Sequence, residues 1–178
     1  MATTATLAVV HRSVITIAQV GDSRAYLVRA GEARQITKDQ SLIQRLIDAG
    51  EMTEGEAAHS ERRNIILQAL GSEATVVPDM YRELAEVGDV LVLCSDGLSN
   101  LVGANDIARI ALADDNMETV CERLVACANS RGGHDNITVV AARFEPADPN
   151  EPPPSPAPPA TRESTSPGLS DRVRRWLR

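Results

Sequence analysis

The sequence predicts an α+β sandwich, because strand-like segments cluster together and helix-like segments cluster together instead of alternating along the chain. Three β-rich runs, at residues 5–10, 14–20 and 25–29, follow one another with only short polar segments between them. A further run at 90–94 is wholly apolar and is typical of a strand buried on both faces. Helical spacing of apolar residues is confined to two stretches, 39–57 and 105–131, which argues against a wound parallel sheet.

Each expected element has its own signal. Thr53 and Glu56 have the spacing of a capping box, which predicts the start of a short helix. Asn105 with Asp106, and Asn116, are good helix caps that precede apolar residues at helical spacing. The expected elements, in chain order, are strands at 5–10, 14–20, 25–29 and up to 36, helices from 39 to 50 and from 53, strands at 80–84 and 90–94, helices from 105 and from 116, and a last strand at 137–144.

Composition divides the chain near residue 146. Residues 1–145 have the apolar content of one ordinary domain. Residues 146–169 are rich in proline and serine, which predicts a disordered linker with a polyproline II stretch. Residues 170–178 are basic, with Val173, Trp176 and Leu177 at helical spacing, so this tail is either disordered or a short amphipathic helix that contacts a partner or a membrane surface.

Composition and charge exclude several classes of function. The net charge is −7, the body has no basic stripe and the chain has only four aromatic residues, which argues against nucleic-acid binding. No apolar stretch has the length of a membrane span and the N-terminus has no signal-peptide pattern, so we expect a cytoplasmic protein. Cys94, Cys121 and Cys127 lie in apolar patterns without zinc-ligand spacing and are expected to be reduced core residues.

Three aspartates stand at the ends of apolar runs. Asp22 and Asp96 each follow such a run, and Asp135 precedes one. A carboxylate at the mouth of a buried strand is costly unless a cation or several hydrogen-bond donors meet it. Gly97 allows a sharp turn and the close approach of a ligand. From the residues alone, each aspartate could equally be a turn residue, or in the case of Asp22 the partner of Arg24.

Three segments together resemble a known family. They are Val20-Gly21-Asp22-Ser23-Arg24-Ala25-Tyr26-Leu27, Leu93-Cys94-Ser95-Asp96-Gly97-Leu98 and Gly132-Gly133-His134-Asp135-Asn136-Ile137-Thr138-Val139-Val140. In order and spacing they are similar to successive signatures of the metal-dependent protein phosphatase 2C family in its bacterial form, and the resemblance covers about residues 2–145. It implies part of a four-layer α-β-β-α sandwich with two mainly antiparallel sheets, and a flap over about 39–71.

The resemblance also implies an activity. Family members hydrolyse phosphoserine and phosphothreonine in proteins with a water activated by two Mn²⁺ or Mg²⁺ ions, which prefer oxygen ligands. By position, Asp96 and Asp135 match ligands of the paired metals, and Asp22 together with Asp96 matches the ligands of a third, weaker metal. The implied partners are phosphorylated proteins, and with them a serine/threonine kinase that shares those substrates.

The sequence also departs from the family pattern, and these departures matter as much as the matches. Its first two signatures, an arginine-bearing segment that clamps phosphate and an Asp-Gly-x-Gly-Gly loop, do not occur in the sequence. We therefore expect the C-terminal portion of a catalytic domain, a truncated product or fragment lacking N-terminal strands and helices and inactive alone. In the flap, Gln40 stands where relatives have histidine, and Ser60-Glu61 where His-Pro is usual. The alternatives are a non-catalytic module that binds phosphoproteins or a partner, and a regulatory module completed by another chain.

Overall fold

The computed structural model describes residues 1–57, 60, 62 and 65–146. Met1–Pro146 form one compact unit. The predicted linker, apart from its first residue, and the predicted basic tail at 170–178 lie outside the described residues, as do five positions of the expected flap. No helix in the described part of the chain is long and apolar enough to cross a membrane.

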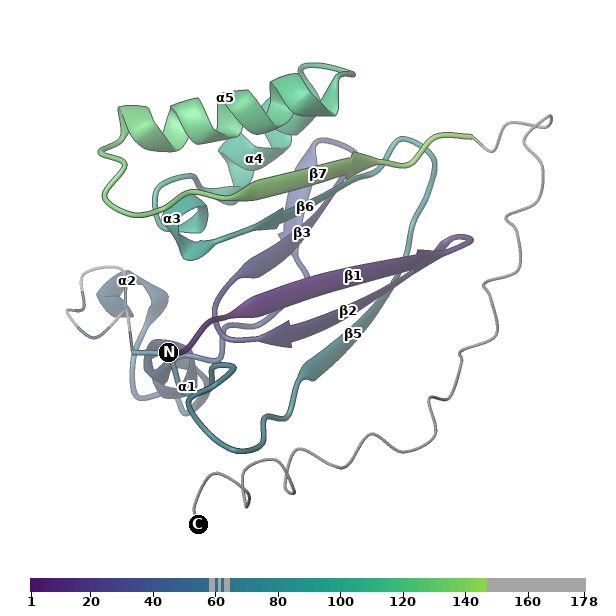
Figure 1. Cartoon of the computed structure of the whole chain (residues 1–178). Helices are drawn as coiled ribbons and strands as arrows, with labels where there is room; N and C mark the ends of the chain where they lie inside the picture. The colour runs from purple at the N-terminus through teal and green to yellow at the C-terminus, as the bar shows by residue number, and fades with distance from the viewer. Residues whose placement is uncertain (58–59, 61, 63–64, 147–178) are drawn as a thin grey trace, which may run out of the picture. The chain divides into compact units, whose positions relative to one another are not determined.

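Two antiparallel sheets form the centre of this unit (Figure 1). The sheet of three strands has the order β1-β2-β5, and the sheet of four has the order β4-β3-β6-β7. Every strand pair within them is antiparallel, so the predicted α+β class with two antiparallel sheets is confirmed. The strands are β1 (Ala5–His11), β2 (Val14–Val20), β3 (Arg24–Arg29), β4 (Glu32–Gln35), β5 (Asp79–Leu84), β6 (Val90–Cys94) and β7 (Val139–Arg143).

The helices begin where capping groups are available. Thr53 and Glu56 form the expected capping box, with the Thr53 backbone N–H donating to Glu56 Oε2 at 2.8 Å and the Glu56 N–H donating to Thr53 Oγ1 at 3.3 Å. Asn116 accepts hydrogen bonds from the backbone of the first turn of α5, as predicted. The helices are α1 (Leu42–Asp48), α2 (Glu54–Ala57), α3 (Asp96–Ser99), α4 (Ala104–Ala111) and α5 (Met117–Ser130).

The predicted cap of the helix near residue 105 is wrong. The cap of α4 is Gly103, and Asn105 and Asp106 cannot cap it because they lie inside its first turn. The Asp106 carboxylate instead accepts hydrogen bonds from Arg109 at 2.7 Å and Arg131 at 2.6 Å. The segment after β6, for which a turn was one interpretation, is the one-turn helix α3.

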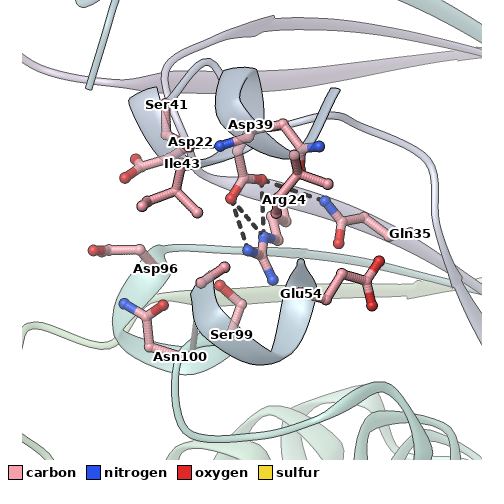
Figure 2. A pocket seen from close by; sticks show the side chains of 13 residues that line it. Asp22, Arg24, Gln35, Asp39, Ser41, Ile43, Glu54, Asp96, Ser99 and Asn100 are labelled. Carbon is pink, nitrogen blue, oxygen red and sulfur yellow. Dashed lines mark hydrogen bonds and ion pairs between the residues drawn. The ribbon is translucent and has the colours of Figure 1, made fainter. Parts of the chain in front are cut away.

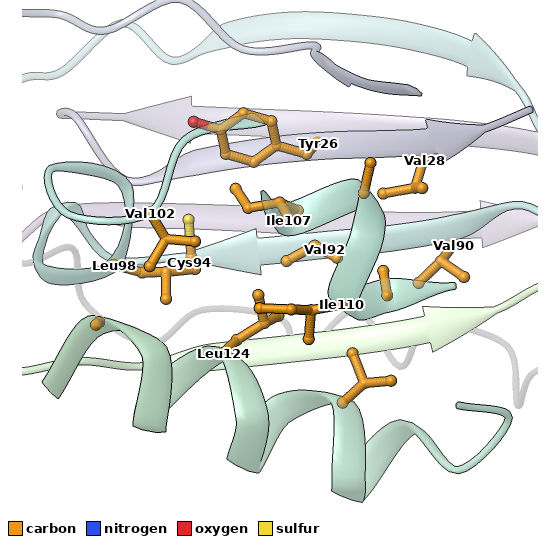
Figure 3. Packing of buried hydrophobic residues seen from close by; sticks show 14 residues of the cluster. Tyr26, Val28, Val90, Val92, Cys94, Leu98, Val102, Ile107, Ile110 and Leu124 are labelled. Atoms are coloured by element: carbon orange, nitrogen blue, oxygen red, sulfur yellow. The ribbon is translucent and has the colours of Figure 1, made fainter. Parts of the chain in front are cut away.

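The core lies in two layers on either side of the four-stranded sheet. On one face, α4 and α5 cover the side chains of Val90, Val92 and their neighbours on β3 (Figure 3). On the other face, Leu91 packs with Ile15 and Ile17 of β2, both of which have no exposed surface. Burying such a side chain contributes about 1.5–3 kcal/mol. The prediction that β6 is buried on both faces is therefore confirmed.

The outer face of the three-stranded sheet has a different character. Leu7 on β1 and Met80 on β5 lie in register on either side of Ala18 of β2, and both are about 60% exposed. Leu84, at the other end of β5, is 64% exposed. Apolar surface of this kind is unusual on a sheet that is solvated on one face, where polar residues are the rule.

Candidate metal centre

Asp22 is held in a tight turn that joins β2 to β3. The turn begins with Gly21, whose φ of +105° favours glycine and whose missing Cβ would overlap the side chain of Thr4. Gln19 Nε2 donates to the carbonyl oxygens of Gly21 and Ser23, at 3.1 Å each. These bonds fix the backbone on both sides of Asp22. The residue itself is only 9% exposed. The position of the carboxylate is therefore set by the turn.

Ser95, the cap of α3, joins the start of this helix, which carries Asp96, to the loop that carries Asp135. Its hydroxyl donates to the carbonyl oxygen of Asn136 at 3.1 Å and accepts from the backbone N–H of Thr138 at 3.0 Å. Its backbone N–H donates to the Thr138 carbonyl oxygen at 3.1 Å. These three hydrogen bonds hold the start of α3 against the segment before β7. Asp96 and Asp135 are therefore brought to the same edge of the sheet.

Gly97 makes this close approach possible. A Cβ at Gly97 would overlap the backbone carbonyl oxygen of Asn136. Its φ is not in the left-handed region, so the glycine is required by space and not by backbone conformation. The spacing of Ser95, Asp96 and Gly97 thus has a packing role as well as an electrostatic one.

The aspartates repel one another in two pairs: Asp96 with Asp22, and Asp135 with Asp96. Burial, and after it the charge of Asp96, raises the pKa of Asp22 above its ordinary value. Burial, and after it the charge of Asp135, raises the pKa of Asp96. Burial and a like charge both disfavour an ionised carboxylate, and a bound cation would reverse both effects.

Asp22 and Asp96 border a cavity of about 420 Å³ between the sheet edge and the flap (Figure 2). Figure 2 also shows that Arg24, on the wall of this cavity, faces Asp39. Arg24 Nε donates to Asp39 Oδ1 at 2.9 Å and Nη2 donates to Asp39 Oδ2 at 2.7 Å. The interpretation of Asp22 as the ion-pair partner of Arg24 is therefore wrong, because Asp39 occupies the guanidinium.

Carboxylates are suitable ligands for a hard divalent cation, but the described residues do not gather enough of them to hold one. Carboxylate oxygens are the ligands that Mn²⁺ and Mg²⁺ prefer. Within the residues described, however, no three acidic, histidine or cysteine side chains are gathered closely enough to hold one ion. Asp22, Asp96 and Asp135 could therefore supply at most part of a coordination shell. His134, the nearest imidazole in sequence, packs against Gly132.

Comparisons with known proteins show to which proteins the chain is similar. The model of the protein phosphatase 2C family matches residues 1–45. The chain is 39% identical over 140 residues to the serine/threonine phosphatase stp of Listeria welshimeri, covering 79% of this chain and 56% of that protein. It is 41% identical over 133 residues to the protein phosphatase PhpP of Streptococcus pneumoniae, covering 75% and 54%. The chain thus spans little more than half the length of these relatives.

Solved structures extend the likeness to the fold. A serine/threonine phosphatase of Streptococcus agalactiae superimposes with a TM-score of 0.75 at 41% identity, over 80% of this chain and 59% of that one. The catalytic domain of the phosphatase PstP, solved in complex with two manganese ions, gives 0.71 at 37% identity, over 82% and 60%. Over this part of the catalytic domain, the chain is homologous to bacterial metal-dependent serine/threonine phosphatases of the protein phosphatase 2C family.

Proposed function

We propose that the chain supplies the acidic part of a metal-dependent site that hydrolyses phosphoserine and phosphothreonine in proteins. The observation that carries the proposal is the series Asp22, Asp96 and Asp135, in which each carboxylate interacts unfavourably with the next. Among the described residues, none of the three forms an ion pair. Such an arrangement is costly without a cation.

The three residues take different roles in this proposal. Asp96 and Asp135 hold the paired Mn²⁺ or Mg²⁺ ions, and Asp22 together with Asp96 holds a further, weaker ion. When bound, the metals supply an activated water and neutralise charge on the phosphoryl group. The chain itself orients the carboxylates through Ser95 and the Gly21 turn, and positions the flap helix α1 beside the cavity.

The substrates in this proposal are phosphorylated proteins, including those modified by a serine/threonine kinase. The segment from Asp39 to the end of α2 lines the cavity on the side away from the strands, where a bound phosphopeptide would meet it. The alternative is a module that binds phosphoproteins or a partner without hydrolysis. It is favoured by the incomplete ligand set of the described residues.

Hydrolysis of p-nitrophenyl phosphate and of a phosphothreonine peptide, with and without Mn²⁺, tests the proposal. The chain alone is expected to show no turnover, because three carboxylates give neither the positioning nor the charge that phosphoryl transfer needs. Joined to the part of PhpP that this chain does not match, it is expected to gain Mn²⁺-dependent turnover.

That gain should disappear with Asp96→Asn or Asp135→Asn. Turnover of a folded fusion that survives both substitutions would refute the ligand assignment. Peptide binding by the chain, with no turnover in either form, would establish the alternative.

A further inference from the structure

Gln40 lies at a junction of four segments of the chain. Its Oε1 accepts hydrogen bonds from the Gly21 backbone N–H at 2.8 Å and from Gln68 Nε2 at 3.1 Å. Its Nε2 donates to Asp79 Oδ2 at 2.8 Å. Its backbone N–H donates to the Gly21 carbonyl oxygen at 2.9 Å, and its carbonyl oxygen accepts from the Leu67 N–H at 2.8 Å. One residue therefore binds both ends of the flap, the first residue of β5 and the turn before Asp22.

We propose that Gln40 is a positioning residue for Asp22, which fixes the flap to the turn that carries this carboxylate. Among the described residues, no neighbouring side chain forms a hydrogen bond or an ion pair with the Asp22 carboxylate. Its place follows from the backbone of the turn. Gln19 holds that backbone from the strand side, and Gln40 holds it from the flap side.

The reciprocal bonds between Gln40 and Gly21 carry most of this argument. Gly21 is buried, and both its N–H and its carbonyl oxygen are bonded to Gln40. The side-chain amide is suited to the position because it accepts and donates at once and is neutral. An aliphatic residue of similar size would keep the backbone bond and leave the buried N–H of Gly21 without its acceptor, which a folded protein tolerates poorly.

Gln68 provides a matched control. It is in the same flap, is likewise half-buried and also forms three side-chain hydrogen bonds, two of them with the backbone of Val77. The substitution Gln68→Leu therefore removes as many bonds as Gln40→Leu but leaves the acceptor of the Gly21 N–H in place. A general loosening of the flap would appear in both variants, whereas a role at the Asp22 turn is specific to Gln40.

Hydrogen exchange of the Gly21 amide, measured by NMR on the whole chain without metal, tests the anchoring directly. In Gln40→Leu we expect exchange at least about tenfold faster than in the wild type, and in Gln68→Leu a change of less than about threefold. Asp79→Ala removes the acceptor of Gln40 Nε2 but leaves the acceptor of the Gly21 N–H in place, and its Gly21 amide is expected to stay protected. If Gln40→Leu does not fold, Gln40→Asn, which is one methylene shorter, replaces it.

Unchanged Gly21 exchange in Gln40→Leu would overturn the inference, as would equal loss of protection in Asp79→Ala and Gln40→Leu. The consequence for metal binding rests on the proposed function and is measured separately, by Mn²⁺ titration calorimetry. Gln40→Leu is expected to weaken binding as much as Asp22→Asn, and the double variant no more than either. Additive losses would show that Gln40 does not act through Asp22. If neither the wild-type chain nor its fusion to the part of PhpP that it does not match binds Mn²⁺ while the exchange result holds, the proposed function fails and the anchoring role stands.

Discussion

Replacing Gly97 with alanine is expected to push α3, which begins with Asp96, away from the loop that carries Asp135. The added methyl would overlap the carbonyl oxygen of Asn136, a backbone atom that cannot rotate away. Overpacking of this kind costs about 1–3 kcal/mol, and stretching the Ser95 hydrogen bonds to that loop adds about 0.5–1.5 kcal/mol. We expect the free energy of unfolding to fall by about 1.5–4.5 kcal/mol, which lowers the thermal midpoint by roughly 3–18 °C.

Gly55 is the matched control. Among the described residues, a Cβ at this position in α2 would meet no atom within 4 Å, so Gly55→Ala is expected to leave the free energy of unfolding unchanged or raise it by up to about 1 kcal/mol. Thermal melts measure the stability of both variants, and Mn²⁺ titration measures the effect on the site, where Gly97→Ala alone should weaken binding. A Gly97→Ala protein as stable as the wild type, with the same Mn²⁺ affinity, would refute this account of how the carboxylates are brought together.

Other substitutions separate stability from metal binding. Arg29 holds the pKa of the buried Asp89 below its usual value, so the pair stabilises the fold above about pH 4 and this contribution is lost as the pH falls further. Asp89→Asn should therefore lower stability by about 2–3 kcal/mol at pH 7 in urea melts, with the gap narrowing below about pH 4. Glu83→Gln, which breaks an exposed ion pair, should cost less than about 1 kcal/mol. Asp96→Asn should weaken Mn²⁺ binding without lowering the metal-free midpoint, and a marked loss of metal-free stability would instead assign Asp96 a structural role.

The strands were predictable because their signals are local. The run 90–94 is apolar at every position, and the structure buries it between α4 and α5 on one face and β2 on the other. The capping groups at Thr53 and Asn116 were equally visible, since they act within three residues. Helix α3 was not predicted, because a helix of four residues has no periodicity to detect.

The contacts that position the aspartates could not be read from the sequence, because they join residues far apart in it. Gln40 was noticed only as a departure from a family pattern, and its bonds to Gly21 and Asp79 depend on where the flap packs. Likewise, Arg24 stands two residues from Asp22 and pairs with Asp39, fifteen residues away. Sequence spacing gives the order of charged groups along the chain, whereas the choice of partner depends on tertiary packing.

That choice of partner has an electrostatic consequence for the site. Arg24 is the guanidinium on the wall of the cavity, and its bidentate pair with Asp39 leaves this pair neutral as a whole. If Arg24 instead paired with Asp22, the aspartate would be satisfied within the protein and would attract a further cation weakly. Because Asp39 occupies the arginine, neither Asp22 nor Asp96 forms an ion pair with it, and the charge of Arg24 lowers the pKa of both carboxylates less than burial and the neighbouring aspartates raise it. The Arg24–Asp39 pair therefore leaves most of the charge that a divalent ion would neutralise, and it does so without contributing a ligand.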